Sequence, residues 1–258
     1  MVIIKKVIIF LVLLIPVLVY GQSTYRVTYD LTYQIDSTNI SSLQSEQMLL
    51  DFAEDISVFK SNTTHLKDSI LKSNHPHSLF GVAKSDFLYK IYKTNGKLVS
   101  LYDYTTYKYE LKEDLPDLKW NLHEDTKTIL DYECKLATTS FAGRDYSAWY
   151  VLEIPISDGP YKFYGLPGLI LEIYDTQNHY HFEAIGITKL HSKIRIKNEE
   201  YREISVKEYE KFLENIKQKP SLILNNPGIQ VPKASLDKYD RNHRERNKLK
   251  NNPIELIK

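Results

Sequence analysis

The sequence predicts a mainly β protein, a single antiparallel and curved sheet built as a meander of hairpins and packed with one or two helices. Three observations carry this prediction. Apolar and polar residues alternate over 23–35, as in a strand with one covered face. Asn95-Gly96 interrupts a second alternating stretch and is a strong hairpin signal. Short turns separate strand-like stretches up to residue 190, which favours antiparallel pairing over βαβ units.

Further strands are predicted where apolar and polar residues alternate between turn-forming residues. These stretches are 87–111, folded back at its Asn-Gly pair, 127–141, 147–156, and 169–190, a hairpin closed over residues 175–178. Helical signals are few. Residues 205–220 carry Ser205 as an N-cap with Glu208 three positions on, a capping box, and Pro220 follows the end. A weaker helix is expected over Thr64–Lys72.

Residues 161–173, YKFYGLPGLILEI, form a nearly all-apolar stretch around a Pro-Gly pair. We expect a tight turn between two buried strands. Pro167 fixes φ at the second position of a type II turn, and Gly168 accepts the positive φ of the third. Gly165 is expected to allow a close backbone approach or a bulge. Gly165, Pro167 and Gly168 are therefore predicted as structural turn residues.

The first 21 residues have the build of a secretory signal peptide. Lys5 and Lys6 precede an apolar run over 7–19, and the small Gly21 precedes the polar Gln22. This run is too short to span a bilayer, which takes about 20 apolar residues. We expect cleavage after Gly21 and export to the periplasm, the outer membrane or the medium, with no stable membrane span left. A retained membrane anchor is the alternative.

The mature chain is expected to form one β-rich domain over 22–232, followed by a basic, partly extended tail over 233–258. The tail holds eight Lys and Arg against four Asp and Glu and closes with Asn-Pro-Ile-Glu-Leu before its last two residues. Because the whole chain carries only +1, the rest of the mature chain is acidic. Basic tails can bind phosphates or acidic surfaces, but the interspersed acids favour a solvated terminus. The acidic domain and the expected export argue against nucleic-acid binding.

Cys134 is the single cysteine of the chain, so no intramolecular disulfide can form and an ordinary hydrophobic core must stabilise the fold. Its neighbours in DYECKLATTSF alternate between polar and apolar residues. This pattern predicts a buried strand position for Cys134 rather than a nucleophile.

The stretch HYHFE contains the one candidate metal site. On a strand, His179, His181 and Glu183 share a face about 6–7 Å apart, and two imidazoles with a carboxylate are suitable zinc ligands. A histidine–aromatic alternation on a half-exposed strand gives the same pattern without a metal, so no cofactor is expected unless zinc binds here. No hydrolase motif accompanies the trio, and no catalytic residue is assigned.

The stretch AGRDYSAWY contains the candidate ligand-binding residues. Arg144 offers a planar fork for a carboxylate or phosphate, and Trp149 and Tyr150 offer aromatic faces for stacking. The alternative places Arg144 in an ion pair with Asp145 or Asp158 and Trp149 in the core.

Residues 165–170, Gly-Leu-Pro-Gly-Leu-Ile, resemble the signature of the GLPGLI family. The resemblance extends over the block 134–173 and to the closing NNPIEL at 251–256. It implies an exported protein without an established activity, and therefore a location in the cell envelope and no mechanism.

Three functions stay open at this level. The first is a non-enzymatic binding or accessory protein of the envelope, with a peptide, a lipid or apolar small molecule, or a partner protein as its ligand. The second is a metal-assisted hydrolase that uses His179, His181 and Glu183. The third is a purely structural component of the envelope.

Overall fold

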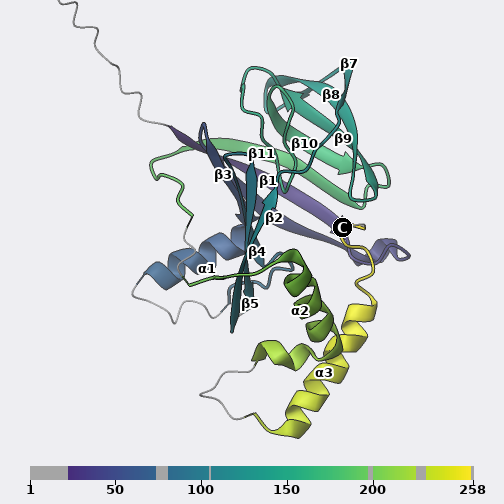
Figure 1. Ribbon diagram of the computed structural model, residues 1–258. Coiled ribbons are helices and arrows are strands. Elements are labelled where there is room, and N and C mark those ends of the chain that lie inside the picture. The colour runs from purple at the N-terminus through teal and green to yellow at the C-terminus, as the bar shows by residue number, and fades with distance from the viewer. Residues whose placement is uncertain (1–22, 74–80, 105, 197–199, 225–230, 257–258) are drawn as a thin grey trace, which may run out of the picture.

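A computed structural model describes residues 23–73, 81–104, 106–196, 200–224 and 231–256 (Figure 1). The expected signal peptide, residues 1–21, lies outside these ranges. None of the helices in the described ranges is both long and apolar enough to cross a membrane.

The protein is mainly β, as predicted. The strands of the described residues form one open sheet in the order β12-β6-β5-β4-β3-β2-β1-β11-β10-β9-β8-β7. Neighbouring strands are antiparallel, except that the short β12 runs parallel to β6. The strands are β1 (Thr24–Gln34), β2 (Leu43–Phe52), β3 (Ile56–Ser61), β4 (Tyr89–Thr94), β5 (Lys97–Tyr104), β6 (Tyr107–Asp114), β7 (Asn121–Ile129), β8 (Tyr132–Phe141), β9 (Arg144–Val151), β10 (Leu169–Asp175), β11 (Tyr180–Leu190) and β12 (Arg202–Glu203).

The sheet consists of two meanders that meet in its middle. The first, β1 to β6, runs from the middle to one edge. Residues 115–120 then carry the chain across to the other edge, and β7 to β11 return to the middle, where β11 pairs with β1. The sheet is strongly bent, so that β7–β10 lie above β4 and β5 in Figure 1.

The helices lie at the β4–β5 end of the molecule (Figure 1). They are α1 (Asn62–Lys72), α2 (Val206–Gln218) and α3 (Lys233–Lys248), with the short 3-10 helices η1 (Ile40–Ser42) and η3 (Pro220–Leu224). The predicted capping box of α2 is confirmed, because Ser205 Oγ accepts from the Glu208 N–H and the Glu208 carboxylate accepts from the Ser205 N–H at 2.9 Å. The helix expected over Thr64–Lys72 is α1, capped by Ser61.

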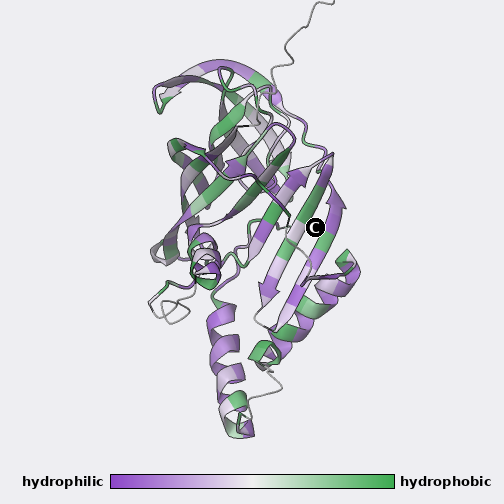
Figure 2. Cartoon of the chain, turned by 90° about the vertical axis from the view of Figure 1, so that its left-hand side faces the viewer, coloured by the Kyte–Doolittle hydropathy of each residue, from purple (hydrophilic) through white to green (hydrophobic). Residues whose placement is uncertain are grey.

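The alternating stretches form strands as expected. In β1 the side chains of Val27, Tyr29 and Leu31 are fully buried. Apolar and polar residues alternate along the strands in Figure 2. Asn95 and Gly96, with φ of 48° and 72°, close the hairpin of β4 and β5, and positive φ at both positions is the requirement of a type I′ turn. Cys134 is buried in β8, as predicted, and burial raises the pKa of its thiol to about 11.

Three predicted boundaries are wrong. The stretch 127–141 is not one strand, because Leu130 and Asp131 take positive φ and turn the chain between β7 and β8. The strand expected over 147–156 ends at Val151, where the irregular connection to β10 begins. The tail, expected to be partly extended, begins with the helix α3. No Gly or Pro interrupts residues 233–248, and Lys248 pairs with Glu245 one turn earlier, so nothing opposes a helix there.

The type II turn over Leu166–Leu169 is also wrong, because the two glycines have exchanged roles. Gly165 takes the positive φ, +97°, whereas Gly168 does not. A Cβ on Gly168 would lie 2.0 Å from the Val151 carbonyl oxygen, so this position is a close approach to β9. No strand precedes the turn either: residues 152–168 form a long irregular connection from β9 to β10.

A buried lysine holds this connection in place. Lys93 of β4 is 6% exposed and forms an ion pair with Asp158 at 2.5 Å. Its ammonium group also donates to three backbone carbonyls of the connection, those of Gly159, Tyr161 and Phe163, at 2.6, 3.2 and 3.1 Å. The apolar richness of the stretch follows from this arrangement, since Phe163 and Leu166 then fill the main core.

Candidate functional site

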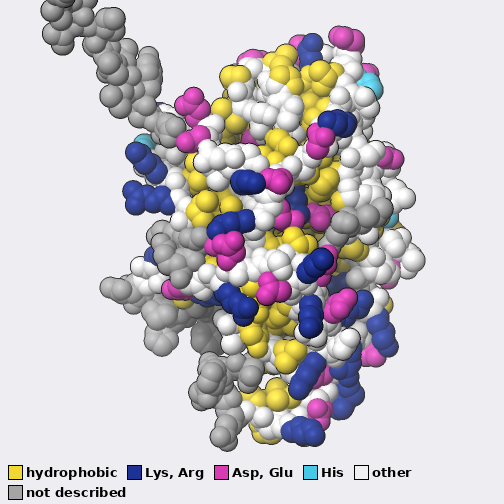
Figure 3. Space-filling view, viewed as in Figure 1, with side chains coloured by type: hydrophobic (Ala, Val, Ile, Leu, Met, Phe, Trp, Pro, Cys, Tyr) yellow, Lys and Arg dark blue, Asp and Glu magenta, His cyan; other side chains and the backbone are white. Residues whose placement is uncertain are grey.

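A groove of about 1000 Å³ opens between three parts of the molecule. One wall is the face of β4–β6, the second is α2, and the third combines residues 161–162 with the end of the chain at 253–255. On the face seen in Figure 3, hydrophobic side chains gather along the middle and are flanked by basic and acidic ones. The groove is larger than two other hollows of the described residues, which measure about 510 and 170 Å³.

Five tyrosines line the groove: Tyr89, Tyr102, Tyr104, Tyr161 and Tyr209. Alternation along β5 places Tyr102 and Tyr104 on one face, and pairing of β4 with β5 sets Tyr89 opposite Tyr102. The ring centroids of Tyr102 and Tyr209 are 4.3 Å apart, and those of Tyr89 and Tyr161 are 5.8 Å apart. The walls thus offer a continuous series of aromatic faces.

The tyrosine hydroxyls are neutral near pH 7. Burial raises the pKa of Tyr89, Tyr102, Tyr161 and Tyr209 well above the usual range. The Tyr104 and Tyr209 hydroxyls lie 2.7 Å apart and share a hydrogen bond. A ligand in the groove would therefore meet aromatic faces with uncharged polar tips.

The rim of the groove is acidic. Asp86, Glu113, Asp114, Glu210 and Glu255 contribute carboxylates, against the ammonium groups of Lys162 and Lys207. Three of these carboxylates are already paired: Asp86 with Lys250 at 2.5 Å, Asp114 with Lys97 at 2.5 Å and Glu255 with Lys162 at 2.7 Å. No ion pair among the described residues holds Glu113 on β6 or Glu210 on α2, which face the groove from opposite walls. The groove thus combines an aromatic interior with an excess of negative charge.

The closing residues 251–256, here called the tail segment, return from α3 to the sheet (Figure 1). Asn252 is buried and donates its side-chain N–H to the Gln34 carbonyl at 2.7 Å, while its own carbonyl accepts from the Tyr180 hydroxyl at 2.8 Å. Glu255 accepts from the Tyr161 hydroxyl at 2.6 Å. The segment is therefore bound residue by residue and is not the solvated terminus expected.

Arg144 is the main anchor of the tail segment. Its Nη2 donates to the Asn252 side-chain oxygen at 2.5 Å and to the Pro253 carbonyl at 2.8 Å, and its Nε donates to the Ile254 carbonyl at 3.2 Å. Its Nη1 forms an ion pair with Asp175 at 2.5 Å, and 3% of the side chain is exposed. The planar fork predicted to bind a ligand thus binds the chain's own C-terminal residues.

The predicted ligand-binding residues are not brought together. Arg144 and Tyr150 lie on the buried face of β9, six positions apart, whereas Trp149 lies on the opposite face beside Lys127. The partner of Arg144 is Asp175, neither Asp145 nor Asp158. None of the three lines the groove, and Arg144 binds the tail segment instead.

The predicted metal trio is also separated. His179 precedes β11 and lies 3.3 Å from Arg144, whereas His181 pairs with Glu172 at 2.9 Å. Glu183 is exposed. Within the described ranges, no three His, Cys, Asp or Glu side chains gather as a metal site. The bend before β11 removes the shared face on which the prediction depended.

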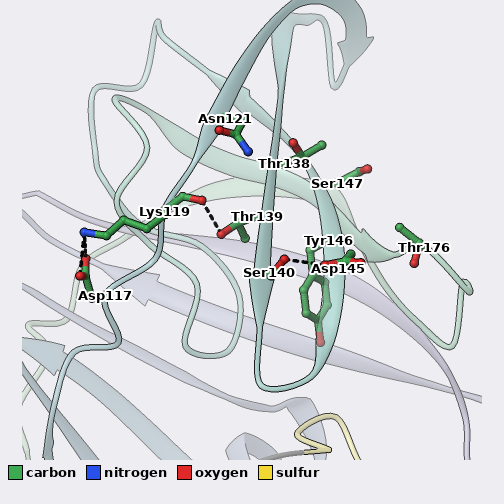
Figure 4. A pocket seen from close by; sticks show the side chains of 10 residues that line it. All are labelled: Asp117, Lys119, Asn121, Thr138, Thr139, Ser140, Asp145, Tyr146, Ser147 and Thr176. Atoms are coloured by element: carbon green, nitrogen blue, oxygen red, sulfur yellow. Dashed lines mark hydrogen bonds and ion pairs between the residues drawn. The ribbon is translucent and has the colours of Figure 1, made fainter.

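A smaller hollow of about 510 Å³ lies between residues 117–121 and the β8–β9 hairpin (Figure 4). Its lining is polar, and its groups bind one another: Lys119 with Asp117, Ser140 with Asp145, and Thr139 with the Lys119 carbonyl. Because these groups already have partners, the aromatic groove is the stronger candidate site.

A family model described as "Protein of unknown function (Porph_ging)" matches residues 142–172, which run from the β8–β9 turn to β10. Two solved structures of PNGF-II, in different crystal forms, are similar with TM-scores of 0.57 and identities of 13% and 14%. Each covers 76% of this chain, which spans about a third of their length, 34% and 33%. This likeness concerns the fold alone. No curated protein matches in sequence.

Proposed function

We propose that this chain is an exported, non-enzymatic binding protein of the cell envelope whose groove holds an extended peptide segment of a partner. The observation that carries the proposal is the aromatic groove with its acidic rim. Aromatic faces bind apolar and cationic side chains, and carboxylates at the rim attract lysine and arginine. The ligand class is therefore a peptide that combines basic with aromatic or aliphatic residues.

The export and the family assignment are part of the same proposal. The basic and apolar start of the chain supports export. The match over 142–172 and the Gly-Leu-Pro-Gly-Leu-Ile sequence support membership in the GLPGLI family. Neither the match nor the fold implies a reaction, and no catalytic group stands out in the groove.

The test uses residues 22–258 and two fluorescent octapeptides, one alternating lysine with leucine and one alternating glutamate with leucine. Anisotropy titration is expected to show binding of the lysine peptide only, weakening as salt is raised. The double variant Glu113→Lys/Glu210→Lys is expected to bind it at least about tenfold more weakly, because both unpaired rim carboxylates are reversed. Glu124→Lys, on the exposed strand β7, is the matched control.

Equal binding of both peptides, or unchanged affinity in the rim variant, would remove the proposal. Binding of a neutral apolar probe that ignores the rim charges would favour a lipid ligand instead.

A further inference from the structure

We propose that the surface holding the tail segment is a peptide receptor, and that it also accepts this segment from a second copy of the chain. The receptor, here called the tail site, comprises Gln34, Ser37, Arg144, Tyr146, Tyr161, Lys162 and Tyr180. This proposal does not depend on any ligand in the groove.

The tail site recognises the particular side chains of the tail segment. Two side chains of the segment are bound specifically: Asn252 lies between Arg144 and the Gln34 carbonyl, and Glu255 lies between Tyr161 and Lys162. The Asn251 side chain adds bonds to Ser37 at 2.9 and 3.1 Å. Such side-chain contacts distinguish this segment from an arbitrary extended peptide.

The geometry of the tail site does not depend on the bound segment. Asp175 fixes Arg144 from the side away from the segment, and Asp175 is itself held by the backbone N–H groups of His179 and Tyr180 at 2.6 and 3.2 Å. The Tyr180 ring lies 5.2 Å from the guanidinium carbon. Arg144, Asp175 and Tyr180 belong to strands of the sheet and His179 directly precedes β11, so the receptor keeps its geometry when the segment leaves.

The contacts of Arg144 favour an equivalent segment over an arbitrary peptide. With the segment in place the Arg144 side chain is 3% exposed, and its Nε and Nη2 lose their three acceptors when the segment leaves. Water then reaches the guanidinium, but the charge-assisted bonds that it donates to two carbonyls and an amide oxygen are regained together only with an equivalent segment. Apart from the tethered segment itself, another copy of the chain supplies such a segment.

The segment is connected to the rest of the chain through α3 alone among the described residues. The segment follows α3, which packs against η3 and α2 at the end of the molecule and buries only Asp240. In the segment itself Asn252 is buried, and the half-buried Ile254 packs against the main core. Release therefore uncovers only the part of the core under Ile254, which is compatible with exchange of the element between copies. The covalent tether favours binding in cis, and exchange dominates where cis binding is blocked.

The experiment uses two complementary variants of residues 22–258. Asn252→Ala removes the side-chain bonds of Asn252 to Arg144 and to the Gln34 carbonyl and leaves the tail site unchanged. Arg144→Met/Asp175→Asn spoils the tail site and leaves the segment intact, and its asparagine keeps the acceptor for the backbone N–H groups. Sedimentation velocity is expected to show each variant as a monomer and their equimolar mixture as a 1:1 complex, which an excess of a synthetic peptide of residues 249–256 dissociates.

A second measurement stays decisive even if the double variant fails to fold. The fluorescent 249–256 peptide is expected to bind Asn252→Ala at least about tenfold more tightly than the native chain, whose site is occupied in cis. The same peptide with alanine in place of its second asparagine, the equivalent of Asn252, is the control and should bind at least tenfold more weakly. Equal binding of the two peptides, or no binding to Asn252→Ala, would overturn the proposal. The rim variants of the groove leave this readout unchanged, so the two proposals fail separately.

Discussion

Two buried cations of this protein perform the same task on different segments. Lys93 holds the connection 152–168 through three carbonyls and is balanced by Asp158. Arg144 holds the tail segment through two carbonyls and an amide and is balanced by Asp175. Both segments form the same wall of the groove. The difference is that strands flank the first segment on both sides, whereas the second follows α3, which packs against η3 and α2.

A buried cation can therefore hold one segment of the groove wall permanently and another segment reversibly. A buried cation with several carbonyl acceptors replaces the hydrogen bonds that an irregular segment would otherwise leave unmade. Where strands flank the segment, its bonds break only on unfolding. Where the segment instead follows a peripheral helix, the same bonds can be exchanged for those of another peptide. The predictions that follow test this difference, in order of decreasing effect.

The largest effect is expected for Lys93→Met. The change leaves Asp158 buried without its cation and frees three carbonyls, so the free energy of unfolding should fall by about 3–5 kcal/mol. Urea denaturation followed by tyrosine fluorescence measures this loss. Adding Asp158→Asn should recover part of it, and a loss below about 1 kcal/mol would contradict the role given to Lys93.

Arg144→Met is expected to cost less, about 2 kcal/mol, because the freed end of the chain moves away and water reaches Asp175. Limited proteolysis should then cut the tail segment, while the connection 152–168 stays protected. If both segments become sensitive together, the distinction between a permanent and a releasable wall is wrong.

A third group of cations and a carboxylate can be compared with those of Lys93 and Arg144, because it holds no irregular segment. Glu172 of β10 is buried between His181 of β11 and the half-exposed Lys127 of β7. Burial acts to raise the pKa of Glu172, but the hydrogen bonds from His181 and Lys127 outweigh it, and the net pKa is lowered. Lys127→Met should therefore cost no more than about 1 kcal/mol, because Lys127 is 41% exposed and His181 still pairs with Glu172.

The same group predicts a pH dependence. A carboxyl whose folded pKa is below its unfolded value, about 4.3, stabilises the fold above that value and loses this contribution as pH falls through the folded pKa. The stability difference between the native chain and Glu172→Gln should thus be constant from pH 5 to 7 and shrink below about pH 4. A difference that grows on acidification would contradict the assignment.

The smallest effect is expected for Tyr104→Phe, which removes one hydroxyl of the Tyr104–Tyr209 pair and no aromatic face. Stability should fall by about 1 kcal/mol or less, and binding of the lysine peptide should change less than twofold. Tyr104→Ala is the contrasting variant, because it removes the face as well. Thermal melting and anisotropy titration on the same samples separate the two contributions.

The strands were predictable where one face is solvated. In β1 the buried residues Val27, Tyr29 and Leu31 alternate with more exposed ones. The hairpin of β4 and β5 is determined locally by Asn95-Gly96. The sequence does not predict β2 and β3, because the last five residues of β2 are buried on both faces and show no alternation. The long pairing of β1 with β11 has no local signal at all.

The site was predictable only in part. Arg144 stands out in the sequence as a binding residue, but its ligand lies 108 to 110 positions further along the chain. The pairing of Tyr102 with Tyr209 depends on how α2 docks on the sheet, which local patterns do not encode. Of the predicted metal trio, His181 and Glu183 lie on β11, whereas His179 precedes the strand and does not share its face.

The seam between β1 and β11 has a consequence for how the chain acquires its shape. These neighbours are separated by about 150 positions, and together they join the first and last long strands of the sheet. Topologies dominated by such distant pairings fold slowly, because a large loop must close before its contacts form. Until β11 pairs with β1, the first meander exposes the unpaired edge of β1. During that interval the newly made polypeptide is most prone to aggregate and most dependent on a chaperone.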